Sequence, residues 1–220
     1  MILHLLFDLD GTLIDSREGV IRSLQHAVTE LGRPAPAFED LTRYIGPPLA
    51  SSLAQLLGTS DTVLIERGVA AYRAQFERAG MFENVLYPGI REALANLTAA
   101  GCKLCVVTAK PRVYAAQIVK HLEVASFFGG IYGPDMAQRH YTKEALIREA
   151  CVAERIEAAR AMMIGDRTED ILGARKNGLR SMAVTWGYEA REELDAAHPD
   201  YVATSSEELV EKIQQANDVS

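Results

Sequence analysis

The sequence predicts an α/β fold: a doubly wound parallel (Rossmann-like) sheet that carries an inserted α-helical domain. Three observations support this prediction. The chain opens with an apolar run of strand length, a long stretch with only helical patterns follows, and strand-like and helix-like segments then alternate to the end. Alternating strands and helices are typical of parallel sheets, and a helical stretch of about 70 residues exceeds an ordinary crossover connection. We therefore expect residues 1–15 and 84–220 to form the α/β domain and residues 16–83 to form the inserted domain.

Residues 3–7 are expected to form the first strand, because they are almost uniformly apolar, as in a strand buried on both faces. Two carboxylates, Asp8 and Asp10, follow directly, and Gly11 then allows a tight turn. Open α/β sheets bind their ligands at the carboxyl ends of their strands. Two neighbouring carboxylates repel each other unless one is protonated or a cation lies between them. An acidic turn after a strand is the simpler explanation, so this motif needs support from elsewhere in the chain.

The inserted domain is expected to contain only helical segments. Asp15 or Ser16 is a suitable N-cap for the first helix, and apolar residues then recur at helical spacing until Gly32 and Pro34 end it. Further helical patterns cover residues 38–44, 49–57 and 62–79.

The rest of the chain alternates between the two kinds of segment from Tyr87-Pro88-Gly89 onwards. Pro111 is expected in the first turn of a helix, where its missing N–H costs nothing. Helices are expected over residues 90–100, 111–122, 142–151, from 168 onwards and 207–215, and strands over residues 103–107, 130–132, 161–164, 181–185 and 201–202.

Other expected strands also end in polar side chains that suit a phosphate or a metal. Thr108 follows the second strand at the start of a helix, which is a natural anion contact. Asp166 and Asp170 follow the fourth strand, and Lys143 opens the helix after the third. Alone, each has an ordinary explanation as a turn residue, a solvated cation, a helix cap or a first-turn acid. Their occurrence together with Asp8 at the ends of strands of one sheet indicates a functional site.

These residues resemble the signatures of the haloacid dehalogenase-like phosphohydrolases, and the resemblance covers essentially the whole chain. The helical insertion after the first strand is similar to the cap domain of that family. Within the family, the closer likeness is to phosphoglycolate phosphatase-like and 5′-nucleotidase-like members. The family signatures correspond to residues 8–13, Thr108, Lys143 and 165–170, and the closer likeness to residues 43–49, 87–89, 108–111 and 165–167.

The resemblance implies a role for each carboxylate. Asp8 would be the nucleophile that forms an aspartyl-phosphate, and Asp10 would be the general acid and base. A Mg²⁺ cofactor would be bound by the carboxylates of Asp8 and Asp166 and by the backbone carbonyl of Asp10. Asp170 would orient the metal-bound waters or Lys143. The cation would thus relieve the repulsion between the neighbouring carboxylates.

The resemblance also implies how the substrate is held. Thr108 and Lys143 would bind the phosphoryl oxygens while negative charge develops on them. The other phosphate-binding positions would be Leu9, Asp10, Gly11 and Ala109. Substrate contacts are expected at Gly46 and Pro47, in an irregular loop of the cap, and at Lys110 and Arg167.

Two positions depart from the family pattern. Arg167 stands where a serine often follows the first aspartate of the last signature. It either reaches the substrate or pairs with Glu169 or Asp170, and we favour the pairing. Glu144 follows the signature lysine at a position where proline is common.

These features predict a Mg²⁺-dependent phosphatase for small phosphorylated metabolites, most simply phosphoglycolate, with nucleoside monophosphates as the alternative. A dehalogenase has no need of the leaving-group acid Asp10. A sugar-phosphate mutase of this fold would carry a histidine near position 20, where this chain has Val20. The alternative to an enzyme is a non-enzymatic phospho-receiver or binding protein. A receiver domain, however, needs no helical insertion.

The amino-acid composition limits the expected cellular compartment and the expected classes of binding partner. The net charge of −7 argues against nucleic acid or an anionic membrane as the main partner. Three cysteines, an odd number in apolar surroundings, predict reduced thiols in a cytoplasmic protein. The sequence begins directly with the first strand and shows no signal peptide or membrane-spanning run. Monomer and homodimer are both compatible with the sequence.

Overall fold

The computed structural model describes residues 1–138 and 141–218, and these form two compact units. The α/β unit consists of Met1–Asp15 and Leu86–Ser220, and the helical unit consists of Ser16–Val85. Among the described residues, no helix is long and apolar enough to cross a membrane.

The α/β unit contains a six-stranded sheet in the order β5-β4-β1-β6-β7-β8, and every neighbouring pair is parallel. This confirms the predicted parallel sheet. The first strand lies in the middle of the sheet, which explains why its apolar residues do not alternate with polar ones. The strands are β1 (His4–Phe7), β4 (Lys103–Val107), β5 (Phe128–Tyr132), β6 (Ala161–Gly165), β7 (Arg180–Val184) and β8 (Tyr201–Ala203).

The register of the sheet brings the polar strand ends together. Phe7 pairs with Val106 on one side and with Ile164 on the other. Because the strands are parallel, Asp8 and Asp166, which follow these strands, come out at the same edge of the sheet.

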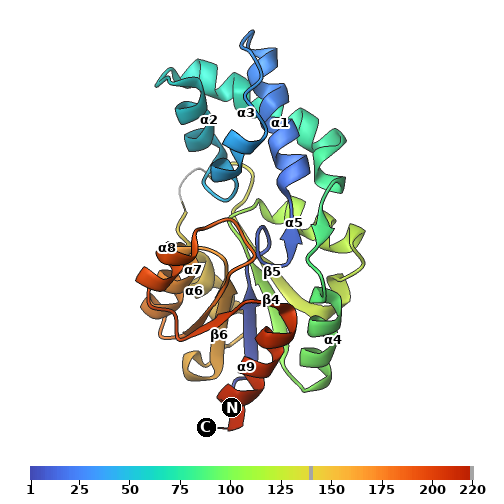
Figure 1. The fold of residues 1–220 in the computed structure, drawn as a ribbon, viewed down its shortest axis with the longest axis vertical. Coiled ribbons are helices and arrows are strands. Elements are labelled where there is room, and N and C mark those ends of the chain that lie inside the picture. The colour runs from blue at the N-terminus through green and yellow to red at the C-terminus, as the bar shows by residue number, and fades with distance from the viewer. Residues whose placement is uncertain (139–140, 219–220) are drawn as a thin grey trace. The chain divides into compact units, whose positions relative to one another are not determined.

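Helices cover both faces of this sheet (Figure 1). One face carries α4 (Ile90–Ala99), α5 (Arg112–His121) and α9 (Ser206–Asp218), and the other carries α6 (Lys143–Ala153), α7 (Thr168–Lys176) and the short α8 (Arg191–Ala196). For the helices between strands, this division follows from the strand order, because right-handed crossovers that run in opposite directions along the sheet place their helices on opposite faces. The last helix, α9, packs against α4. Beneath α6, a buried apolar cluster includes Leu6, Val107, Ile147 and Met163.

The helical unit is built around the packing of α1 (Arg17–Glu30) against α3 (Thr62–Arg78). Ile21 and Leu24 are buried on α1, and Val69 and Phe76 on α3. The side chain of Asp61 caps α3 by accepting a hydrogen bond of 2.9 Å from the Val63 N–H. The other elements of this unit are η1 (Glu39–Tyr44), α2 (Leu49–Leu57) and η2 (Gly80–Phe82).

Some predicted elements differ in the structure. The segment expected as a helix over residues 38–44 is a 3₁₀ helix over Glu39–Tyr44. Pro111 lies just before α5 rather than in its first turn, because its ψ of 131° is extended. Several short elements were not predicted: α8, η2, β2 (Ile14–Asp15), β3 (Val85–Leu86), η3 (Ala125–Phe127) and η4 (Ala158–Arg160). These elements have two to six residues, too few for a periodic pattern to develop.

Candidate active site

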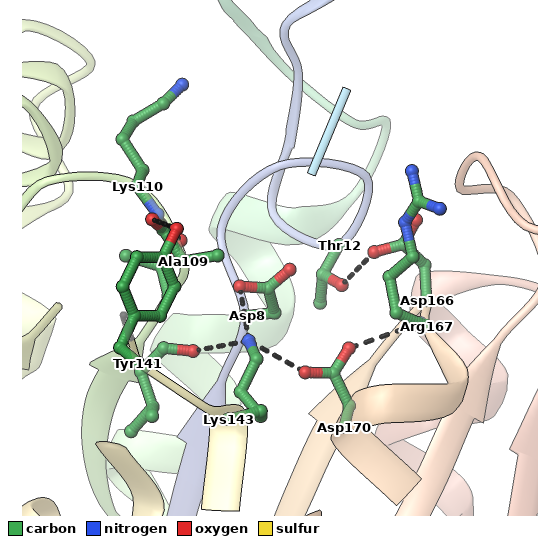
Figure 2. A network of polar contacts seen from close by, with 11 residues as sticks. Asp8, Thr12, Ala109, Lys110, Tyr141, Lys143, Asp166, Arg167 and Asp170 are labelled. Carbon is green, nitrogen blue, oxygen red and sulfur yellow. Dashed lines mark hydrogen bonds and ion pairs between the residues drawn. The ribbon is translucent and has the colours of Figure 1, made fainter. Parts of the chain in front are cut away.

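Three side chains from three elements meet at the carboxyl edge of the sheet (Figure 2). Asp8 follows β1, Lys143 is the first residue of α6, and Asp170 lies in the first turn of α7. The Lys143 ammonium is 2.8 Å from Asp8 Oδ1 and 2.7 Å from Asp170 Oδ1. Thr142 fixes the start of α6, because its hydroxyl accepts a hydrogen bond of 3.1 Å from the Ala145 N–H.

All three N–H donors of the Lys143 ammonium have partners. Besides the two carboxylates, Lys143 donates to the Val107 carbonyl at 3.0 Å. Burial alone lowers the pKa of a lysine, but the charges of Asp170 and Asp8 outweigh it, so the pKa of Lys143 is raised. Lys143 is therefore a permanent cation that holds Asp8 and Asp170, and it can bind a phosphoryl oxygen only by exchanging or sharing one of these partners.

Asp166 is held on both of its oxygens and is fully buried. Thr12 donates its hydroxyl to Oδ1 at 3.1 Å, and the main-chain N–H of Tyr188 donates to Oδ2 at 2.9 Å. Two glycines make room for this carboxylate. A Cβ on Gly11 would lie 2.2 Å from Asp166 Oδ2, and one on Gly187 would lie 2.2 Å from Asp166 Cβ.

The three carboxylates form a donor set that fits a hard divalent cation. Oxygens of Asp8, Asp166 and Asp170 lie within 4.8 Å of one another, and all three residues are buried. Lys143 supplies one positive charge, so the ionised cluster keeps an excess of two negative charges. Burial raises the pKa of both Asp166 and Asp170, and the negative charge of Asp8 raises the two pKa values further. Such a group of carboxylate oxygens would suit a magnesium ion.

The loop between β4 and α5 lies beside this cluster. Thr108 is buried, and its hydroxyl oxygen accepts a hydrogen bond of 3.2 Å from the Lys110 N–H. The Tyr141 hydroxyl donates to the Ala109 carbonyl at 2.9 Å (Figure 2). The Lys110 ammonium is 2.6 Å from Asp10 Oδ1, and both side chains are about nine-tenths buried or more. Lys110, expected to contact substrate, thus holds the Asp10 carboxylate.

Three other residues expected at the site make main-chain hydrogen bonds that were not predicted. The Gly11 N–H donates to the Ile14 carbonyl at 2.9 Å, inside the turn. The carbonyl of Leu9 accepts hydrogen bonds from the same turn. The main-chain N–H of Arg167 donates to Asp170 Oδ2 at 3.1 Å.

The two candidate residues of the inserted segment, Gly46 and Pro47, belong to the helical unit and are exposed there. Gly46 has a φ of 101°, which glycine adopts without the strain that a side chain would bring.

A second group of residues at the site, in the loop after β7, was not predicted from the sequence. Trp186, Gly187 and Tyr188 contact Thr12 or Asp166. The loop follows the carboxyl end of a parallel strand, so the rule that pointed to Asp8 and Asp166 also points to it. Its residue types are those of an ordinary loop, which is why they did not stand out.

Comparison with known proteins identifies the family. The family model described as haloacid dehalogenase-like hydrolase matches residues 5–184. This chain belongs to that family. The match includes Asp8, Lys143 and Asp166, so the resemblance predicted from the motifs is confirmed, and the alternative of a non-enzymatic phospho-receiver is set aside.

Three curated relatives of this haloacid dehalogenase-like enzyme have different names. A 5′-nucleotidase of Pseudomonas aeruginosa is 39% identical over 90% of this chain and 89% of the relative. The tyrosine-protein kinase PtkA of Mycobacterium tuberculosis is 33% identical over 94% of this chain and 71% of the relative. A phosphoglycolate phosphatase of Vibrio parahaemolyticus is 30% identical over 94% of both chains.

Solved structures agree with the fold. The crystal structure of a predicted phosphatase from Clostridium acetobutylicum superposes with a TM-score of 0.91 at 37% identity, covering 98% of this chain and 99% of that one. The chain is a haloacid dehalogenase-like phosphatase with a parallel central sheet.

The raised pKa values of Asp166 and Asp170 predict how pH affects this phosphatase without metal. The folded protein keeps protons on these groups at pH values where the unfolded chain, with aspartate pKa values of about 4, has lost them. The folded state then binds more protons, so the free energy of unfolding decreases as the pH rises from about 5 towards 8. Urea unfolding in excess chelator across this range measures the effect.

Two controls make this measurement specific. Asp170→Asn removes one of the raised groups, so its stability should depend less on pH than that of the wild type. Saturating Mg²⁺ should also flatten the wild-type dependence, because metal ligands must be deprotonated. A metal-free wild-type protein whose stability increases between pH 5 and 8 would contradict the assignment.

Proposed function

We propose that this phosphatase hydrolyses small phosphate monoesters through an aspartyl-phosphate on Asp8. The observation that carries the proposal is the setting of Asp8. Its carboxylate stands at the end of the central strand, with Oδ1 2.8 Å from the ammonium of Lys143 and within a buried group of carboxylates. This arrangement fixes the rotation of a nucleophile and supplies the positive charge that a dianionic substrate needs.

In the first step, an oxygen of Asp8 attacks phosphorus while the bond from phosphorus to the leaving oxygen breaks. Asp10 gives its proton to that oxygen, which leaves as an alcohol. In this structure Asp10 is paired with the Lys110 ammonium at 2.6 Å, so it must take up a proton before this transfer.

In the second step, Asp10 takes a proton from water as the water oxygen attacks the phosphorus of the aspartyl-phosphate. The bond between phosphorus and Asp8 breaks, which releases inorganic phosphate and restores the Asp8 carboxylate and the protonated form of Asp10. Thr108 and Lys143 are proposed to bind the phosphoryl oxygens in both steps. When bound between Asp8 and Asp166, Mg²⁺ would neutralise charge on the substrate oxygens.

Two substrate classes are proposed. The relative named phosphoglycolate phosphatase supports phosphoglycolate, the substrate that the sequence motifs favour. The relative named 5′-nucleotidase has the higher identity and supports nucleoside 5′-monophosphates equally well. Specificity between them is proposed to come from the helical unit acting as a cap, with contacts at the exposed loop of Gly46 and Pro47.

A relative named tyrosine-protein kinase makes transfer to a protein hydroxyl the second candidate activity. An aspartyl-phosphate can deliver its phosphoryl group to water or to an alcohol, and the difference lies in the acceptor. The proposed cytoplasmic setting suits either activity and is supported by the three free thiols of Cys102, Cys105 and Cys151.

A panel of phosphorylated metabolites, assayed with Mg²⁺ and with excess chelator, tests the proposal. We expect release of inorganic phosphate from phosphoglycolate or from a nucleoside 5′-monophosphate, and loss of this release in chelator. The same panel run on Pro47→Ala should show a changed substrate ranking, with hydrolysis of a generic aryl phosphate retained.

Several outcomes would overturn parts of the proposal. Full turnover in excess chelator would show that the reaction does not require a metal. Consumption of a phosphate donor without phosphate release, together with a phosphorylated tyrosine peptide, would favour transfer over hydrolysis. An equal loss of all substrates in Pro47→Ala, with the ranking unchanged, would make the loop structural.

A further inference from the structure

The two carboxylate oxygens of Asp166 are linked to each other by a ring of hydrogen bonds and main chain. Thr12 donates its hydroxyl to Oδ1 at 3.1 Å, and the Thr12 carbonyl accepts a hydrogen bond of 3.0 Å from Trp186 Nε1. The chain then continues through Gly187 to Tyr188, whose main-chain N–H donates to Oδ2 at 2.9 Å. The two groups that hold Asp166 are therefore tied to each other by Trp186.

The loop from Trp186 to Tyr188 also packs directly against Asp166. A Cβ added to Gly187 would lie 2.2 Å from Asp166 Cβ and 2.4 Å from Oδ2, so the backbone of the loop is in direct contact with this side chain. Asp166 is fully buried, so its side chain is packed against these groups. A displacement of the loop must therefore change the position of the carboxylate.

Tyr188 and Trp186 also contact residues of the α/β unit that lie next to the start and the end of the inserted helical segment. The Tyr188 hydroxyl donates to Asp15 Oδ1 at 3.2 Å, and Asp15 is the last residue before the helical segment begins. The Trp186 ring lies 6.3 Å from the ring of Tyr87 at an interplanar angle of 59°. Tyr87 is the second residue of the α/β unit after the chain returns.

We propose that Tyr188, assisted by Trp186, is a positioning residue that couples metal binding at Asp166 to the two chain ends that lead into the helical unit. The proposal rests on the proposed function, because it requires a divalent cation at Asp166. One residue holds the carboxylate with its main chain and Asp15 with its side chain. By thermodynamic reciprocity, a conformation of Asp15 that strengthens the Tyr188 contact strengthens metal binding, and metal binding stabilises that conformation.

Titration calorimetry with Mg²⁺ on metal-free protein tests this inference without relying on turnover. Tyr188→Phe removes only the hydroxyl, and Asp15→Ala removes its acceptor. Each substitution is expected to weaken Mg²⁺ binding by about 2- to 10-fold, the range of a single hydrogen bond. The double variant should lose no more than the larger single effect, because both changes break the same contact.

Tyr201→Phe is the matched control. It removes a hydroxyl that accepts a hydrogen bond of 3.3 Å from Arg180 on the outer strands of the same sheet, and its Mg²⁺ affinity should equal that of the wild type. Trp186→Phe, which removes the contact with Thr12, should also weaken Mg²⁺ binding and provides a second variant if Tyr188→Phe does not fold.

The outcomes separate this inference from the function on which it rests. Wild-type protein that does not bind Mg²⁺ would overturn the proposed metal site and the inference with it. Wild-type protein that binds Mg²⁺, with an unchanged affinity in Tyr188→Phe or in Trp186→Phe, would overturn the inference alone. Losses that multiply in the Tyr188→Phe, Asp15→Ala double variant would also overturn it, since they would show two independent effects.

Discussion

Replacing Asp8 with asparagine is expected to lower kcat by on the order of 10³-fold or more, with the fold intact. The amide cannot attack phosphorus, and no other described carboxylate has both the position at the end of β1 and the direct contact with Lys143. The remaining Lys143 contacts, with Asp170 and the Val107 carbonyl, should keep the site folded. Steady-state kinetics on the best substrate of the panel, together with circular dichroism, measures both parts.

Asp135→Asn is the control for this variant. Asp135 is an exposed carboxylate that pairs with Arg112 at 3.3 Å on the α/β unit, so its removal should leave kcat unchanged. A further test uses beryllium fluoride, which is expected to attach to Asp8 in wild-type protein and not in Asp8→Asn. Activity close to the wild-type level in Asp8→Asn would move the nucleophile elsewhere.

Replacing Lys143 with methionine is expected to have the largest effect on stability. Methionine fills a similar volume but leaves Asp8 and Asp170 buried without their shared cation. Breaking a buried ion pair by removing one partner costs about 3–5 kcal/mol, so metal-free protein should lose free energy of unfolding in this range at pH 8. Activity should also disappear, because Asp8 loses the group that orients it. Urea unfolding in chelator and steady-state kinetics provide the two measurements.

The loss in Lys143→Met should become smaller at lower pH, because protons then take the place of the missing cation. Lys176→Met is the control: Lys176 is an exposed lysine that pairs with Glu144 at 3.2 Å, and its removal should change stability by less than about 1 kcal/mol. A Lys143→Met protein as stable as the wild type at pH 8 would show that Asp8 and Asp170 do not depend on this ion pair.

The sequence alone determined the parallel sheet and the principal residues of the candidate site. Strong apolar runs marked the long strands, and Asp8, Thr108 and Asp166 directly follow three of them. In a parallel sheet, the order of residues along the chain is enough to place such side chains, because all carboxyl ends lie at one edge. The start of a helix at Lys143 was predictable for a similar reason, since Thr142 is a standard N-cap residue.

Only the tertiary structure decided which groups contact one another. Lys110 and Asp10 are 100 residues apart, and nothing in the local sequence indicates their ion pair. The place of Gly11 against Asp166, and the contacts of Trp186 and Tyr188, likewise depend on segments that are far apart in the chain. Local patterns report the period and polarity of one segment, whereas these contacts depend on how the loops from separate strands pack at the edge of the sheet.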